Sequence, residues 1–480
     1  MIDGIGRRVA QGVKWTVIYK VTGQLINWVS TLWVVRMLSP SDYGLNAMME
    51  VPLDFAMAFV TWGMFQALIQ KETLERKELS AVFGFMLGLN LIAFSIFQIC
   101  AKDIAEYFRE PNLEDLIRII SLVFLMVPFR IIPNALLDQK LQFKVRAQVD
   151  LAASTSGATT AVILAILGAG VWALVASVLV NYLLRAVVLA IIQPWFVLPS
   201  MNVREAKAIL MLGTKVLVSG ILIIATGKMI EIVVGPVIGA EKLGIFAVAA
   251  QLAMLPVSRV LPIINQTLYP AFVHINSDRE RIREFFIKSL QYAGLIIVPA
   301  AVGLYMTSDL VIDLFFGERW NDLKIVMPIL LLMLPVALIR NLLTSNLVAL
   351  GKSNLQIILH GVVLILTAIL CWVFREDGLH GLIWITVLAM VFSSILVYAV
   401  SSSIFGINLK DIVRSMFPSI LSSVAMGGVL YVLGFAISEF SQIVKLAAMI
   451  TIGMGFYSVF LRIAYTRIFS EIISVLREKQ

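Results

Sequence analysis

The chain has 480 residues, of which 60% are hydrophobic and only 14% are charged, and its mean hydropathy is +0.94. A soluble globular chain carries about 25% charged residues, so this composition excludes a water-soluble protein and indicates one that lies in a membrane. The formal net charge of +8 does not indicate nucleic-acid binding, because the basic residues are distributed among loops and form no patch on a soluble face.

The first half of the chain contains six apolar segments, each as long as the roughly 20 helical residues that cross a bilayer. They cover residues 11–37, 43–70, 79–101, 116–137, 147–168 and 171–193. The basic start of the chain, Met1 to Arg8, leads directly into the first segment with no small-residue cleavage site. We therefore expect the first segment to remain as a membrane anchor and not to be removed as a signal peptide.

Eight further apolar segments follow. They cover residues 208–235, 243–270, 287–307, 323–348, 354–375, 380–403, 413–436 and 443–465. The sequence thus predicts an all-α polytopic membrane protein with about fourteen transmembrane helices.

The basic residues are concentrated in every second loop between the predicted helices. An N-terminus in the cytoplasm brings most of them to one side: Lys71, Arg76, Lys77, Lys140, Lys144, Arg146, Arg279, Arg281, Arg283, Lys288, Arg467, Arg477 and Lys479. On the other side, the loop from Lys102 to Asp115 carries five acidic residues against two basic ones. Since loops that remain in the cytoplasm are enriched in Lys and Arg, both termini are predicted to be cytoplasmic.

Two internal alignments indicate that the first twelve helices form a repeat. A shift of 207 residues places 121–137 on 328–344 with six identities in seventeen, among them Pro128 with Pro335. A shift of 200 residues places Leu38–Gly44 on Ile238–Gly244 without a gap. Six helices return the chain to the same side of the membrane, so the two copies are parallel.

This repeat predicts three parts, which are an N-terminal six-helix lobe at 1–200, a C-terminal six-helix lobe at 201–408, and a trailing helix pair with a cytoplasmic tail at 409–480. Parallel lobes of this kind hold a substrate site near the bilayer midplane, which opens alternately to each side. The repeat therefore favours a transporter with a central cavity.

Polar side chains follow one face of each of the first two helices. Lys20, Gln24 and Asn27 are spaced by four and three residues, and Glu50 and Asp54 by four, so each set lies on one helical face. A hydrogen-bonded seam between helices explains the uncharged members. An aqueous cavity explains the charged ones better, because an ionisable group in the bilayer costs about 2.5–3.5 kcal/mol on insertion scales.

The candidate site residues fall into three sets by charge. The cations expected to bind an anionic substrate in the cavity are Lys20, Arg130, Arg185, Lys228, Arg259 and Arg340. The residues expected to form the polar lining of the cavity are Gln24, Asn27, Asn134 and Asn341. The candidates for coupling to a proton or sodium ion are Glu50, Asp54 and Glu231. The surplus of cations favours a phosphate-bearing guest. A local pair between Lys228 and Glu231, three residues apart, is an open alternative.

Catalytic constellations are absent from the sequence. The three histidines, His274, His360 and His380, are not spaced with carboxylates or cysteines for metal binding, and no Gly-rich phosphate loop occurs. We expect no enzyme activity, no catalytic residue, no metal site and no cofactor other than a coupling ion.

Several short strings in order along the chain resemble a known family: Gly12–Trp15, Leu38–Gly44, Gln66–Gln70, Leu141–Lys144 and Phe316–Trp320. They resemble the Wzx-type polysaccharide flippases of the multidrug/oligosaccharidyl-lipid/polysaccharide exporter superfamily, on the branch of the colanic and teichuronic acid exporters. The resemblance implies a multi-pass protein of the bacterial inner membrane that flips undecaprenyl-pyrophosphate-linked oligosaccharide repeat units. It also implies membrane lipids as neighbours and, as candidate partners, a polysaccharide polymerase and the chain-length machinery. We expect a monomer.

Three other functions remain open. An ion-coupled drug/cation antiporter of the same superfamily would use a dominant carboxylate in its cavity, for which Glu50 and Asp54 are candidates. A lipid II flippase would share the architecture, and the trailing helix pair would then offer a groove for the lipid tail. A membrane glycosyltransferase or polymerase would need a long catalytic loop outside the membrane, whereas the longest loops here have about fifteen residues.

Overall fold

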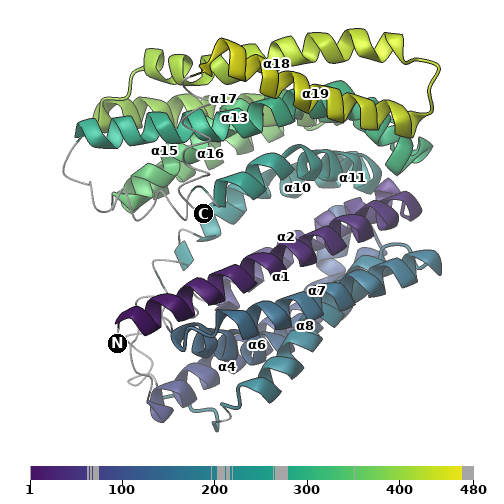
Figure 1. Ribbon diagram of the computed structural model, residues 1–480. Helices are drawn as coiled ribbons and strands as arrows, with labels where there is room; N and C mark the ends of the chain where they lie inside the picture. The colour runs from purple at the N-terminus through teal and green to yellow at the C-terminus, as the bar shows by residue number, and fades with distance from the viewer. Residues whose placement is uncertain are drawn as a thin grey trace. The chain divides into compact units, whose positions relative to one another are not determined.

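All the elements that the structure describes are helices, in agreement with the predicted fold class (Figure 1). The computed structural model describes residues 2–61, 64, 68, 75–195, 197–202, 211, 214, 217–218, 220–262, 264, 279–350 and 352–466. Lys71, most of the string Gln66–Gln70 and the basic residues of the C-terminal tail lie outside these ranges.

Ten helices of the described chain are long and apolar enough to cross a membrane, or eleven if one bent pair is a single span. The first two helices, α1 (Ile2–Met37) and α2 (Pro40–Thr61), are not among the ten. They carry the polar stripes found in the sequence, which lower their hydropathy. The multi-span architecture is confirmed, and the number fourteen stays a prediction.

The chain divides into two units, Met1–Gly244 and Ile245–Gln480. This division follows contacts, whereas the predicted parts 1–200, 201–408 and 409–480 follow sequence repetition and stay a prediction. Residues 228–244 belong to the first unit because they pack on α2 and on α4 (Arg76–Phe108). There the Tyr107 hydroxyl donates to the Ile232 carbonyl at 2.7 Å, and the Glu110 carboxylate accepts from the Ala240 backbone N–H at 3.2 Å.

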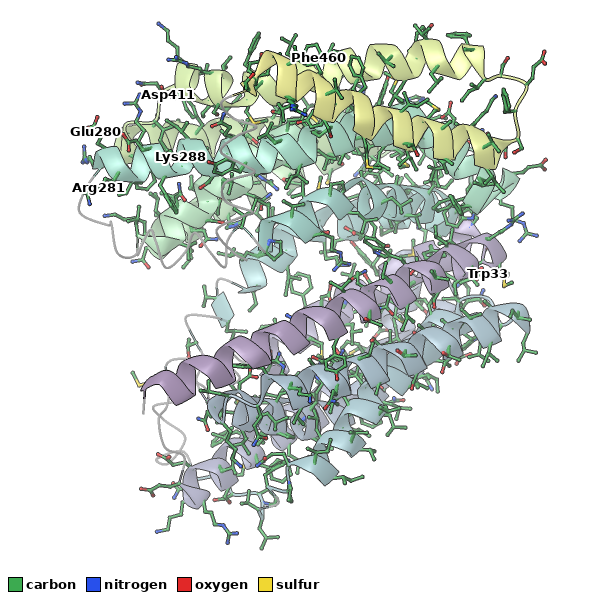
Figure 2. All side chains as sticks on the ribbon, viewed as in Figure 1. Trp33, Glu280, Arg281, Lys288, Asp411 and Phe460 are labelled. Carbon is green, nitrogen blue, oxygen red and sulfur yellow. The ribbon has the colours of Figure 1, made fainter. Side chains whose placement is uncertain are left out.

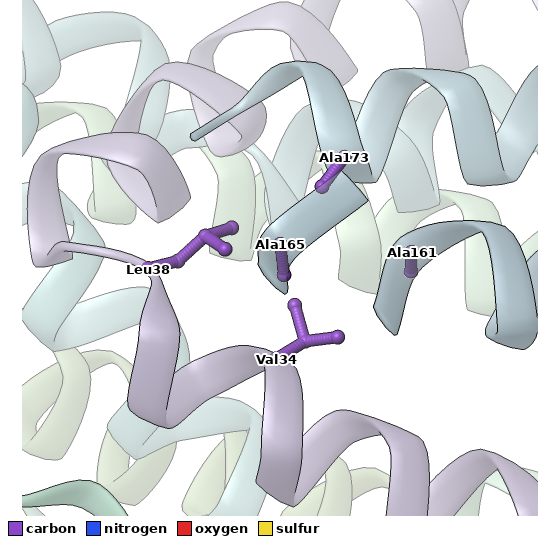
Figure 3. Packing of buried hydrophobic residues seen from close by; sticks show 5 residues of the cluster. All are labelled: Val34, Leu38, Ala161, Ala165 and Ala173. Carbon is purple, nitrogen blue, oxygen red and sulfur yellow. The ribbon is translucent and has the colours of Figure 1, made fainter. Parts of the chain in front are cut away.

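Unit 1 is a bundle of α-helices around small apolar side chains. After α4, its helices are α5 (Leu113–Ile120), α6 (Leu122–Gln139), α7 (Phe143–Ile166), α8 (Trp172–Ile192), α10 (Met229–Val233) and the start of α11 (Gly235–Ala253). Helix α7 packs between α1 and α8. Figure 3 shows part of this packing, in which Val34 of α1 and Leu38, the residue after its end, lie near three alanines of α7 and α8. These alanines allow the helices to approach closely.

The string Leu38–Gly44 has a structural explanation at the start of α2. The Asp42 carboxylate accepts from both the backbone N–H and the hydroxyl of Ser39, at 2.8 and 2.7 Å, which caps the helix. Its other oxygen accepts from the Val171 N–H at 2.9 Å, at the start of α8. Pro40 stands at the first helical position, where the missing N–H is tolerated.

Two glycines that the 200-residue shift aligns make reciprocal contacts. Helix α11 is broken at Gly239, which has a φ of +81°, so a new helical stretch begins at Ala240 just as α2 begins at Pro40. A Cβ atom at Gly44 would collide with the Ala240 carbonyl, and one at Gly244 would collide with the Pro40 carbonyl. Backbones can approach this closely only where the side chain is missing.

The segment that follows α8 runs back along α4. The Ser200 N–H donates to the Ser80 carbonyl at 3.0 Å, and the Ser80 hydroxyl donates to the Leu198 carbonyl. A Cβ at Gly84 would collide with the Ser200 backbone. Trp195 packs edge-on to Phe83, with ring centroids 4.9 Å apart. These contacts attach the segment between the predicted lobes to unit 1.

Unit 2 is a second bundle built on one long helix. Its elements are α13 (Arg279–Val311), the π-helical turn η1 (Ile312–Phe316), the 3₁₀ turn η2 (Glu318–Trp320), α14 (Leu323–Leu332), α15 (Leu334–Ala349), α16 (Ser353–Phe374), α17 (Gly378–Phe405), α18 (Leu409–Ala436) and α19 (Gln442–Ala464). Helix α13 packs against α15, α18 and α19. Helices α14 and α15 are bent by 47° at the break between them, beside the repeat proline Pro335.

Candidate functional site

A cluster of charged side chains joins α2 to the start of α10 inside unit 1. The Lys228 Nζ lies 2.9 Å from Glu50 Oε2 and 3.4 Å from Asp54 Oδ2. The Asn46 amide donates to Glu50 Oε1 at 2.9 Å. Asn46, Glu50 and Asp54 follow one another at every fourth residue of α2, so they share one face of the helix, which presents the two carboxylates to Lys228. With Glu231, these residues form what we call the acidic cluster.

Lys228 owes its position to a break in the helix. It is the N-cap of α10, with a φ of −101° and a ψ of 8°. Its side chain is only 17% exposed, whereas those of Glu50 and Asp54 are each 43% exposed. The ammonium group is therefore the buried end of the ion pair, and the two carboxylates extend toward the more open side.

Glu231 lies one turn after Lys228, but the ion pairs that Lys228 makes in the described chain are with Glu50 and Asp54. The Glu231 Oε2 is buried and has no hydrogen-bond partner in the described chain. If all are ionised, three carboxylates surround one ammonium group. The local charge is therefore negative, although the sum over all predicted interior residues is positive.

A second cluster brings three arginines together between α6, α7 and α8. The Arg130 guanidinium carbon lies 4.4 Å from the centroid of the Tyr182 ring, a distance typical of a cation–π contact. The Arg185 Nε lies 3.5 Å from Asp150 Oδ1, and the Arg146 Nε lies 4.0 Å from Asp150 Oδ2. We call these five residues the arginine cluster.

The arginine cluster contains N–H donors that form no hydrogen bond within the described chain. The Nε atoms of Arg130 and Arg185 are buried and make no hydrogen bond to the described chain. Arg146 also pairs with Asp138, so two carboxylates balance three guanidinium groups. Guanidinium groups bind phosphate oxygens through two parallel N–H groups. Arg130 and Arg185 can therefore accept an oxyanion that the carboxylates do not supply.

The polar stripe of α1 lies at the edge of unit 1. Lys20 is exposed, and Gln24 and Asn27 are half-buried. One residue earlier, the Tyr19 hydroxyl accepts from the Gln148 amide of α7 at 3.2 Å. Gln148 lies two residues before Asp150 of the arginine cluster. Within the described residues, no hydrogen bond or ion pair joins Lys20, Gln24 or Asn27 to either cluster.

The remaining predicted residues make local contacts. Asn134 of α6 is half-buried, and its Oδ1 has no hydrogen-bond partner in the described chain. In unit 2 the Arg340 Nη1 donates to the Ser393 hydroxyl at 3.2 Å, and Asn341 donates to the Ala337 carbonyl of its own helix at 2.8 Å. Arg259 is exposed.

The structure thus brings together six of the thirteen predicted residues in two clusters of unit 1, namely Glu50, Asp54, Lys228 and Glu231 in one and Arg130 and Arg185 in the other. The sequence reasoning did not select Tyr182 and Asp150. Tyr182 precedes Arg185 by three residues, and Asp150 follows Arg146 by four, so both are visible as helical neighbours of a basic residue. Helical spacing does not show that each of them contacts an arginine on a different helix.

Comparisons with known proteins agree on one family. Residues 33–325 match the family model described as "Polysaccharide biosynthesis protein". The chain is 26% identical to the lipopolysaccharide biosynthesis protein WzxC of Escherichia coli, over 70% of this chain and 68% of that protein. It is 24% identical to the teichuronic acid biosynthesis protein TuaB of Bacillus subtilis, over 95% of each.

Among solved structures, the chain is similar to the lipid II flippase MurJ in an inward closed conformation. The TM-score is 0.75 at 15% sequence identity, and the match covers 94% of this chain and 99% of that one. At this identity the likeness shows a shared fold.

Proposed function

Because the chain belongs to the polysaccharide biosynthesis protein family, whose model matches residues 33–325, we propose that it flips an undecaprenyl-pyrophosphate-linked oligosaccharide across the bacterial inner membrane. The lipid-linked sugar would move from the cytoplasmic to the outer leaflet and supply surface polysaccharide. A role in supplying surface polysaccharide is supported by the relatives in Escherichia coli and Bacillus subtilis, which are named for lipopolysaccharide and teichuronic acid biosynthesis.

The observation that carries the proposal is the arginine cluster. A lipid-linked oligosaccharide has an apolar tail, a doubly phosphorylated link and a polar sugar chain. Its pyrophosphate is the part that cannot cross hydrocarbon without a counter-charge. The Nε atoms of Arg130 and Arg185 are buried and donate no hydrogen bond to the described residues, although that of Arg185 lies 3.5 Å from Asp150 Oδ1. Both lie inside a helix bundle that spans the membrane. They are the groups that would receive the pyrophosphate.

The acidic cluster has a separate role in the proposal. Lys228 is held by Glu50 and Asp54, so it contributes to substrate binding only after it leaves them. A proton or sodium ion that neutralises the carboxylates would release the ammonium group toward an anion. Glu50, Asp54 and Glu231 are thus proposed as the coupling residues and Lys228 as the group that they control.

A second candidate function is a cation antiporter, and one observation favours it. The acidic cluster carries three carboxylates for one ammonium group, and a cavity of negative charge attracts cationic guests. In that case neutralising Glu50 or Asp54 would abolish transport, while neutralising Arg130 and Arg185 would leave it intact. The flippase proposal instead expects that neutralising Arg130 and Arg185 abolishes transport.

The proposal includes no catalytic step. Energy would come from an ion gradient, the membrane potential or the substrate gradient. We further propose a multi-pass protein of the inner membrane with both termini in the cytoplasm, which acts as a monomer beside a polysaccharide polymerase and the chain-length machinery. The basic residues of the loops support this orientation.

A reconstituted assay tests the proposed function. Purified protein is placed in liposomes with a fluorescent undecaprenyl-pyrophosphate-linked oligosaccharide, and a membrane-impermeant reagent reports the fraction in the outer leaflet. We expect translocation by the wild type and a loss of at least tenfold in the Arg130→Gln/Arg185→Gln variant. Arg109→Gln, at the exposed end of α4, is the matched control. Translocation of a cationic dye, but not of the lipid-linked sugar, would refute the flippase proposal and support the antiporter.

A further inference from the structure

A groove opens on unit 2 where α13 meets the start of α18 and the residue after α19. It has a volume of about 910 Å³, and Ile287, Val413, Phe417 and Tyr465 contribute to its lining. The side chains of Val413 and Phe417 are 55% and 53% exposed, and that of the adjacent Leu409 is 59% exposed. Apolar side chains so exposed in a membrane protein face lipid chains and not water.

Two basic side chains line the same groove. Lys410 and Arg414 are one helical turn apart on α18, and both are exposed. Neither side chain makes an ion pair or hydrogen bond within the described chain. They stand in the first turns of a 28-residue helix, where the helix dipole adds to their positive charge.

The carboxylate of Asp411, which also lines the groove, does not neutralise these two residues, because it is already engaged. Asp411 Oδ2 lies 2.7 Å from Arg283 Nη2 and accepts from Arg283 Nε at 2.9 Å. The same oxygen accepts from the Asn408 backbone N–H at 3.3 Å, which caps α18. The groove therefore combines an apolar wall with two cations that form no ion pair with any residue the structure describes.

The charged residues around the groove lie at one end of two packed helices. Figure 2 shows Asp411 of α18 at the same end as Glu280, Arg281 and Lys288 of α13. This is the end that the distribution of basic residues assigns to the cytoplasm. Side chains at a helix end there are level with the phosphates of the inner leaflet.

We propose that this groove binds a membrane phospholipid with an anionic phosphodiester headgroup. The phosphate lies against Lys410 and Arg414, and an acyl chain lies along Val413 and Phe417. Charge complementarity selects the anionic lipid, because a zwitterionic headgroup would bring its own cation to the same place. The site consists of unit 2 residues only, so it is separate from the arginine cluster of unit 1 and independent of the proposed function.

Native mass spectrometry of the whole protein tests the site. The protein is released from micelles that contain dioleoyl-phosphatidylglycerol or dioleoyl-phosphatidylcholine, and retained lipid is counted. We expect the wild type to retain the anionic lipid in preference. Lys410→Gln/Arg414→Gln should weaken that retention by about 30-fold, since each basic residue near an anionic headgroup contributes about one kilocalorie per mole.

Two further variants keep the test decisive. Lys352→Gln/Arg319→Gln removes two exposed charges of unit 2 outside the groove and should retain the anionic lipid like the wild type. Val413→Trp fills the groove but keeps Lys410 and Arg414, and should lose the lipid. Equal retention of both lipids by the wild type, or undiminished retention by both groove variants, would overturn the proposal. Displacement by undecaprenyl pyrophosphate in preference to the phospholipid would assign the groove to the substrate tail instead.

Discussion

Replacing Lys228 by glutamine tests whether the acidic cluster has the charges that the structure assigns. The substitution removes an ammonium group that lies 2.9 Å from Glu50 and 3.4 Å from Asp54. At an effective dielectric constant of about 20, these distances correspond to attractions of about 6 and about 5 kcal/mol. Desolvation of the ammonium group offsets most of this gain.

The net effect on stability is smaller, because the carboxylates are 43% exposed. Exposed ion pairs contribute about 0.2–1 kcal/mol, whereas breaking a buried pair costs about 3–5 kcal/mol. We expect an intermediate loss of about 1–3 kcal/mol, measured as a lower unfolding midpoint in detergent. Lys102→Gln is the matched control, because Lys102 and its partner Glu106 are 68% and 67% exposed.

A double variant separates stability from transport. Lys228→Gln/Glu50→Gln leaves Asp54 as the one carboxylate of the former ion pair and should recover much of the lost stability. Under the proposed function it should still fail to restore surface polysaccharide in a strain that lacks the protein. Normal export by this variant would refute the role of Lys228 and leave it a structural counter-ion. An unchanged unfolding midpoint in Lys228→Gln would refute the electrostatic reasoning itself.

Three other predictions follow from separate parts of the chain. Gly44→Val should destabilise the protein by about 1–3 kcal/mol through overpacking against the Ala240 carbonyl, whereas Gly434→Ala, with open space around it, should be neutral or stabilising in thermal unfolding. Arg130→Lys should lower translocation at least several-fold although the charge is kept, because an ammonium group lacks the planar, bidentate face; unchanged rates would exclude direct phosphate binding. A cysteine at Asn112 should react with an impermeant thiol reagent added outside intact cells and one at Lys352 should not, and the reverse labelling would overturn the orientation.

Much of the helical architecture could be predicted because a bilayer demands long apolar segments. The string Leu38–Gly44 also proved informative, since serine, proline and aspartate at these positions are a helix start. The sequence did not reveal why Gly44 is a glycine. Its reason is the Ala240 carbonyl, which lies 196 residues later in the chain, and only the aligned Gly244 hinted at it.

The candidate site was predicted less completely, for a physical reason. Helical spacing shows which residues share a face of one helix, but not which other helix that face meets. Lys228 and Glu231 were therefore a natural local pair. The structure instead places the Lys228 Nζ 2.9 Å from Glu50 and 3.4 Å from Asp54, which lie 178 and 174 residues earlier in the chain. Tyr182 and Asp150 were overlooked for the same reason.

The translocation assay with a lipid-linked oligosaccharide tests the central claim most directly. Liposomes with the wild-type protein should expose the fluorescent undecaprenyl-pyrophosphate-linked sugar to the impermeant reagent well beyond the half that faces outward at the start. Liposomes with Arg130→Gln/Arg185→Gln should stay near that half. A wild-type protein that leaves the inner half protected, or a variant as active as the wild type, would contradict the claim that the arginine cluster carries the pyrophosphate across the membrane.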